Sequence, residues 1–338
     1  MKRLSINLAP KRVPKRLMLS ELTPGTEVKP RTREINLRLK GKNNAQFAVV
    51  EVCNDKIIIG WDKGQIEIYS STDLGRQTLL NSYRSPVSCL QCTCTEIISG
   101  YRDGNICVWN IENGKMEQKL SIQEKRDHAR CMRWRAPRLV VGTTGGKVKI
   151  WEYCGTFFTL LCSLDEQPAW MRGIMHVDFN EKYLIVQKMQ PAGFDDCVDV
   201  KDLNGQQIHS ISFPSQQCLR SVALDGNCVI TLDHDNVARI SDISTATCLK
   251  KLEGQFSPLS LVDAHDGIFG ATGNKDGTAR TIIWNVKAVL EGTEGPLADF
   301  SHLNVPYNNG LVFKLGENII VTGCGFAKPT INVTDFVA

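Results

Sequence analysis

Four arginines in this sequence could act together to bind an anion. Each one lies near the start of a stretch that we expect to form the strand nearest the centre of a repeated fold: Arg84, Arg130, Arg172 and Arg220. If those strands surround a channel, the guanidinium groups gather at its mouth. There they would bind phosphate or carboxylate through paired N–H donors. The offsets of the four residues within their repeats differ, so a solvated surface is the alternative interpretation.

Other reactive side chains form no catalytic or metal-binding motif. Residues 143–147 resemble a phosphate-binding loop, but Val148 stands where Ser or Thr would bind magnesium, and a strand pattern follows. Cys89, Cys92 and Cys94 are close together, yet a structural zinc site needs about four ligands, and no second Cys/His pair lies nearby. The six histidines form no pair at metal-ligand spacing. We therefore expect no metal, no cofactor and no enzymatic activity. A hydrolase assembled from distant repeats is the weaker alternative.

A repeated module positions these residues. Each copy has a short apolar run, a glycine, a turn residue and an alternating strand that ends at a fixed position. Residues 57–69, 97–109, 140–151 and 273–284 hold clear copies, and residues 195–202, 235–242 and 329–335 hold weaker ones. The end-of-strand position recurs after 40 to 50 residues, which is the period of a propeller blade. It is occupied by Tyr69, Trp109, Trp151, Lys201, Ser241, Trp284 and Thr334.

The residue types within the module fit β-structure. Gly104 and Asn236 supply the positive φ values of tight hairpin turns. Residues 148–151 alternate between apolar and polar, as a half-buried strand should, whereas apolar runs such as residues 57–59 do not alternate. We expect these runs to be inner strands that are buried on both faces between neighbouring blades. The pattern predicts an all-β propeller of about seven blades.

An N-terminal strand is expected to close the ring. The last copy ends at residues 335–337, and no outer strand follows it. Residues 33–39 alternate strictly and precede the first copy, so they can complete the last blade and cover its open edge. The expected domain organisation is a basic flexible N-terminal tail over residues 1–30 and a propeller over residues 31–338.

The sequence resembles the WD-repeat family. The resemblance spans residues 33 to 338 and rests on the octamer at residues 103–110, DGNICVWN, and its parallels at Trp151 and Trp284. It implies a WD-repeat β-propeller. The Gly-His that often opens such a repeat is missing, so we do not expect its His-centred hydrogen-bond network. Residues 99–110 are also similar to blades of the propellers that bind substrate in F-box adaptors of ubiquitin ligases, although no F-box is recognisable in the residues before the closing strand.

Two loops are candidate partner-binding elements. In WD-repeat proteins the loops between the second and third strands lie on the same face as the connections between blades, and that face is most used by partners. The sequence enlarges two of them, at residues 187–194 and 324–328. Met189, Phe194 and Phe326 are therefore candidate contacts, since loops on rigid scaffolds commonly carry function. Neutral insertion is the alternative.

Charge and composition limit the location and the kind of partner. Residues 1–42 hold twelve Lys and Arg against three Glu, so the net charge of +4 comes from this segment. Its KRVPKR run resembles a nuclear import or nucleic-acid patch, but no aromatic residues interleave with it. No apolar run is long enough to cross a bilayer. Thirteen scattered cysteines indicate reduced thiols. We expect a cytoplasmic protein, with the nucleus as second location, and no membrane partner.

These observations favour an interaction scaffold without chemistry of its own. Its expected partners are other proteins, with acidic or phosphorylated peptides as the class that an arginine ring would bind. Nucleic acid is expected only through the basic tail, and the chain is expected to be a monomer within a larger complex. Substrate recognition in a ubiquitin ligase is the alternative function.

Overall fold

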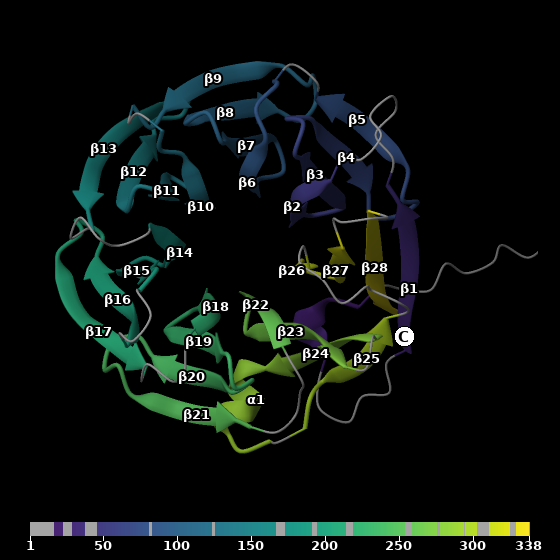
Figure 1. Ribbon diagram of the computed structural model, residues 1–338. Coiled ribbons are helices and arrows are strands. Elements are labelled where there is room, and N and C mark those ends of the chain that lie inside the picture. The colour runs from purple at the N-terminus through teal and green to yellow at the C-terminus, as the bar shows by residue number, and fades with distance from the viewer. Residues whose placement is uncertain are drawn as a thin grey trace, which may run out of the picture.

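Seven four-stranded antiparallel sheets stand around a common axis in the computed structural model of the chain (Figure 1). The structure describes residues 17–22, 29–37, 46–80, 83–123, 126–166, 173–190, 195–213, 219–253, 259–275, 278–293, 295–302, 311–324 and 329–337. This architecture is a seven-bladed β-propeller, so the predicted fold class is confirmed.

Each blade runs from an inner strand at the axis to an outer strand at the rim. The inner strands are β2 (Phe47–Cys53), β6 (Val87–Cys92), β10 (Ala129–Arg135), β14 (Ile174–Phe179), β18 (Leu219–Asp225), β22 (Leu259–His265) and β26 (Leu311–Leu315). The second strands are β3 (Lys56–Trp61), β7 (Glu96–Tyr101), β11 (Arg138–Thr143), β15 (Tyr183–Lys188), β19 (Cys228–Asp233), β23 (Ile268–Lys275) and β27 (Ile319–Cys324).

The two remaining positions complete the sheets. The third strands are β4 (Ile66–Ser70), β8 (Asn105–Asn110), β12 (Lys147–Tyr153), β16 (Asp196–Asp202), β20 (Ala238–Asp242), β24 (Thr278–Asn285) and β28 (Thr330–Val337). The outer strands are β5 (Arg76–Leu80), β9 (Met116–Ser121), β13 (Phe158–Asp165), β17 (Gln207–Phe213), β21 (Cys248–Leu252), β25 (Ala298–His302) and β1 (Lys29–Asn36). We number the blades 1 to 7 from β2 to β26, so β1 belongs to blade 7.

The repeat period translates directly into strand register. The predicted end-of-strand residues pair with one position of the second strand throughout, as Tyr69 does with Ile57 and Thr334 with Ile320. The apolar runs form the second strands, inside the third and outer strands of each blade. They are buried on both faces as expected: Ile57 and Ile59 pack in the cluster shared with blade 7, and Ile58 packs in the cluster shared with blade 2.

Turn residues sit where the hairpins need positive φ. Gly104 has φ +84°, and a Cβ there would lie 2.8 Å from the carbonyl oxygen of Asp127. Glycine is therefore required both by the backbone conformation and by the space available. Asn236 has φ 64°, a conformation that asparagine tolerates better than most residues. Both predicted turns are confirmed.

The ring is closed by β1, which pairs antiparallel with β28 from Lys29 opposite Val337 to Asn36 opposite Thr330. Closure by an N-terminal strand is thus confirmed, but the strand begins four residues before the predicted start at Arg33 and ends at Asn36, before the predicted end at residue 39. The reason for the early start is an ion-pair cluster that the alternation pattern does not reveal. The buried carboxylate of Asp335 accepts two hydrogen bonds from Arg31, at 2.9 and 2.7 Å, and lies 3.1 Å from Arg33.

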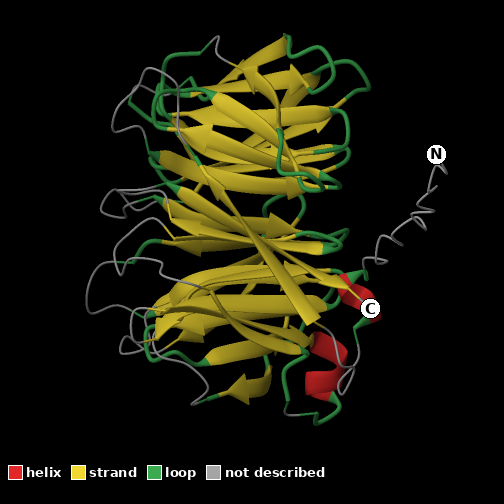
Figure 2. Ribbon diagram, turned by 90° about the vertical axis from the view of Figure 1, so that its right-hand side faces the viewer, coloured by secondary structure: helices red, strands yellow, loops and turns green. Residues whose placement is uncertain are grey.

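The chain docks on the propeller before residue 30, where the tail was expected to end. The short helix η1 (Leu19–Glu21) places Leu19 and Leu22 in an apolar cluster with Phe313 and Phe336 of blade 7. The basic KRVPKR run lies outside the described residues. Figure 2 shows η1 and α1 (Val286–Leu290) on the same face of the disc. None of the helices in the described ranges is long and apolar enough to cross a membrane.

Candidate functional site

One residue of each inner strand stands at the same level around the axis. Each pairs with the residue seven positions later on its second strand, as Glu51 does with Ile58 and Lys314 with Val321. We call this set the polar ring, because six of its seven members are polar. Its members in chain order are Glu51, Gln91, Arg133, Asp178, Ala223, Asp263 and Lys314.

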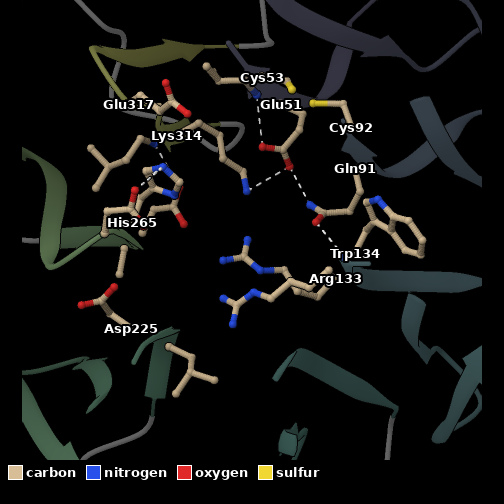
Figure 3. Close-up of a pocket in the computed structure, with 18 of the residues that line it drawn as sticks. Glu51, Cys53, Gln91, Cys92, Arg133, Trp134, Asp225, His265, Lys314 and Glu317 are labelled. Atoms are coloured by element: carbon tan, nitrogen blue, oxygen red, sulfur yellow. Dashed lines mark hydrogen bonds and ion pairs between the residues drawn. The ribbon is translucent and has the colours of Figure 1, made fainter. Parts of the chain in front are cut away.

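Side-chain contacts within the polar ring join successive blades (Figure 3). Lys314 Nζ of blade 7 lies 3.2 Å from Glu51 Oε2 of blade 1, and Gln91 Nε2 of blade 2 donates to the same oxygen at 2.7 Å. The backbone N–H of Trp134 in blade 3 then donates to Gln91 Oε1 at 3.0 Å. These bonds satisfy buried polar groups across three blade junctions.

The next junction is made by two arginines that share one carboxylate. Arg133 Nε and Arg135 Nη2 of blade 3 each lie 3.1 Å from Asp178 Oδ1 of blade 4, and the Asp178 side chain is only 2% exposed. Arg135 Nη1 also donates to the carbonyl oxygen of Phe179. Elsewhere, Asp263 Oδ2 accepts from the Leu315 N–H at 3.0 Å. Ala223 interrupts the polar ring in blade 5.

The polar ring opens into a cavity of about 400 Å³ at the end of the axis where the inner strands finish. We call this cavity the channel-end pocket; six of the seven blades line it. Its blade 3 wall is basic, with Arg133 and Arg135, whereas the wall formed by blades 5 to 7 is acidic, because its four carboxylates outnumber the one cation, Lys314: Asp225, Asp263, Asp266 and Glu317. Figure 3 shows Asp225 across the cavity from Arg133. The pocket therefore has two walls of opposite charge.

Burial and neighbouring charges set the protonation states in and around the pocket. Burial lowers the pKa of Lys314, but Asp263 and Glu51 raise it more, so its pKa lies above the ordinary value. Burial also lowers the pKa of Arg133, but nearby carboxylates, of which Asp178 has the largest effect, raise it more. This pKa too therefore lies above its ordinary value. Burial raises the pKa of Asp225 and lowers the pKa of His176 to about 4. Lys314 and Arg133 are thus cations at neutral pH, and His176 is neutral.

The three described residues of the predicted arginine ring lie at the opposite end of the inner strands. Arg130 and Arg220 occupy equivalent half-buried positions beside the bulges of β10 and β18. Arg220 Nη2 lies 3.3 Å from His234 Nδ1. Arg84 is exposed before β6 begins, so it is not equivalent to the other two. Arg172 lies outside the described residues.

The predicted loop residues are described only in part. Met189 directly follows β15, is half-buried, and donates its backbone N–H to the carbonyl oxygen of Gly173 at 3.0 Å. Phe194 and Phe326 lie outside the described residues. Their role as partner contacts therefore stays a prediction.

Sequence reasoning missed the polar ring because its members have no type in common. A usable signal does exist: counting back seven residues from the centre of each apolar run finds Glu51 from Ile58 and Arg133 from Val140. The same count finds a polar residue in six of the seven blades and Ala223 in the remaining one. Within the described part of the chain, no three His, Cys, Asp or Glu side chains are grouped so that they could hold a metal ion.

Comparisons with known proteins agree with this architecture. The family model for the WD40 repeated domain matches residues 28–126. A search of curated proteins found no match. The crystal structure of the computationally designed Ika8 protein is similar, with a TM-score of 0.62 and 16% identity over 86% of this chain and 97% of that one. The chain is therefore a seven-bladed β-propeller, and its residues 28–126 are similar to the WD40 repeated domain.

Proposed function

We propose that this propeller is a non-catalytic protein-interaction module whose channel-end pocket binds a mixed-charge segment of a partner protein. WD40 propellers are typically protein-interaction scaffolds, which supports the general part of the proposal. The specific part rests on one observation. The basic wall with Arg133 faces an acidic wall with Asp225, Asp266 and Glu317 across one cavity. An acidic side chain of the partner would face the basic wall, and a neighbouring Lys or Arg would face the acidic wall.

The basic wall offers a prepared site for a carboxylate. Asp178 holds Arg133 through Nε, so the guanidinium is fixed in place while its two terminal nitrogens remain for a ligand. A fixed guanidinium loses less conformational freedom on binding than a free one. A pocket of about 400 Å³ is also within the range of natural ligand sites, and it accepts side chains rather than a folded domain.

A peptide selection against the full chain tests the proposal. A displayed library of acidic, basic, mixed-charge and phosphorylated peptides would be panned on the wild-type protein. We expect mixed-charge peptides to be enriched, and Arg133→Gln to weaken them about tenfold or more, because a charge-assisted hydrogen bond contributes about 1.5 to 3 kcal/mol. Asp225→Asn should weaken the same peptides.

Arg130→Gln is the matched control, because Arg130 lies on the same strand at its opposite end. It should leave the affinity of mixed-charge peptides unchanged. A different result would favour the predicted arginine ring on the other face. In that case the selected peptides would be purely acidic or phosphorylated, and Arg130→Gln, but not Arg133→Gln, would weaken their binding. A melting curve of each variant checks that it is folded.

Substrate recognition in a ubiquitin ligase is the second candidate function. It rests on the resemblance of residues 99–110, which form most of the hairpin of β7 and β8 in blade 2. Within the described residues, η1 and α1 are the only helices, and neither is a helical adaptor module. Stoichiometric co-purification of a cullin-ligase linker protein with this chain would favour this candidate over the first.

A further inference from the structure

Two cysteines from neighbouring blades meet at the rim of the channel-end pocket. Cys53 is the last residue of β2 in blade 1, and Cys92 is the last residue of β6 in blade 2. Both line the pocket, and both are free and half-buried. Figure 3 shows their sulfur atoms directed toward each other. The 2.7 Å hydrogen bond between Gln91 and Glu51 fixes the two strand ends beside them.

We propose that Cys53 and Cys92 form a peroxide-sensitive pair that closes into a disulfide between blades 1 and 2. The two thiols would be oxidised by two electrons, and a hydroperoxide such as H₂O₂ would be reduced. This site does not depend on the proposed function of the pocket, because its chemistry needs only the two sulfur atoms and the oxidant.

The reaction would take place in two balanced steps. The Cys53 thiolate attacks a peroxide oxygen; an S–O bond forms, the O–O bond breaks, and the released hydroxide takes up a proton to become water. Cys92 then gives up its proton and attacks the Cys53 sulfur. The S–S bond forms, the S–O bond breaks, and the second hydroxide leaves as water with that proton.

The surroundings assign the first step to Cys53. A hydrogen bond from the Cys92 thiol lowers the pKa of Cys53, while burial raises the pKa of Cys92. The charged groups that face Cys53 are Glu51 of its own strand, Lys56 of β3 and Glu317 after β26. Thiolates, rather than thiols, attack peroxides. Cys53 is therefore the attacking thiol, and Cys92 is the resolving one.

Other cysteines provide internal comparisons. Cys89 and Cys131 occupy equivalent positions in blades 2 and 3, opposite Gly100 and Gly142. Burial raises the pKa of Cys89 strongly and that of Cys131 to about 12, so both should react slowly. Cys154 is exposed, but its Sγ contacts the hydroxyl of Thr159 at 3.7 Å rather than a second thiol.

The test uses the reduced full-length chain and equimolar H₂O₂. After a timed reaction, free thiols are alkylated, the protein is digested without reductant, and peptides are analysed by mass spectrometry. We expect one linked peptide pair that joins Cys53 to Cys92 and disappears on reduction. Failure of this pair to form under conditions that oxidise Cys154, or an equal yield of other pairings, would overturn the proposal.

Three variants assign the two roles. Cys92→Ser should accumulate a sulfenic acid on Cys53 that a dimedone-type probe captures, because its resolving thiol is gone. Cys53→Ser should lose rapid oxidation of Cys92 as well as the linked pair. Cys154→Ser is the control and should form the Cys53–Cys92 pair in full. The wild-type measurement decides the proposal even if a variant folds poorly.

Discussion

At the scale of single residues, Asp178 is the group on which the basic wall of the channel-end pocket depends. Its side chain is almost fully buried and faces two guanidinium groups that are 20% and 36% exposed. Removal of one partner from a buried ion pair leaves charge without compensation. Because the arginines retain contact with water, the cost should fall below that of a fully buried pair.

Asp178→Asn keeps the shape of the side chain and removes its charge. We expect the free energy of unfolding at pH 7 to fall by about 2 to 3 kcal/mol, measured by urea denaturation. Asp55→Asn is the matched control, since the Asp55 side chain is 58% exposed in its 3.2 Å pair with Lys56. That change should stay within about 0.5 kcal/mol of wild type. If both substitutions lowered the free energy of unfolding equally, Asp178 would stabilise the fold no more than an exposed ion pair does.

At the scale of elements, β1 converts an open arc of blades into a closed ring. It supplies the outer strand of blade 7 and brings Arg31 and Arg33 to the buried carboxylate of Asp335. Without it, the edge of β28 would present unpaired backbone groups to other chains. Leu19 and Leu22 add a second attachment on the same blade.

A deletion series separates these two attachments. Removal of residues 1–16 should leave the melting temperature unchanged, because it keeps the attachment that the structure describes from Leu17 onward. Removal of residues 1–28 should lower it, because Leu19 and Leu22 leave an apolar cluster. Removal of residues 1–40 should give aggregated or poorly folded protein. Cooperative melting of a soluble chain that lacks residues 1–40 would contradict closure by β1.

The elements could be predicted from the sequence because their signals are local. Gly104, Asn236 and the apolar run of β3 lie within a few residues of the hairpins that they specify, and these signals recur at one period. The start of β1 was predicted four residues too late. Asp335, near the other end of the chain, binds Arg31 as well as Arg33, and this contact holds the earlier residues in the strand. Alternation within residues 33–39 holds no information about that contact.

At the scale of the whole molecule, the channel-end pocket exists only because the ring closes. Lys314 of blade 7 and Glu51 of blade 1 come from opposite ends of the chain and form an ion pair across the closure. The pattern within either blade alone does not show that these two blades are neighbours. The sequence suggested anion-binding arginines at the start of the inner strands, such as Arg130, whereas Arg133 and Arg135 lie where the same strand, β10, ends.

Hydrogen–deuterium exchange of the full chain, with and without a selected mixed-charge peptide, tests most directly whether the channel-end pocket is the binding site. We expect slower exchange on binding in the turns that border the pocket, at Asn54, Gly226, Asp266 and Gly316. Backbone amides around Arg84 and Gly145, on the opposite face, should be unaffected. Protection confined to that opposite face, with no change around the pocket, would contradict the proposed function.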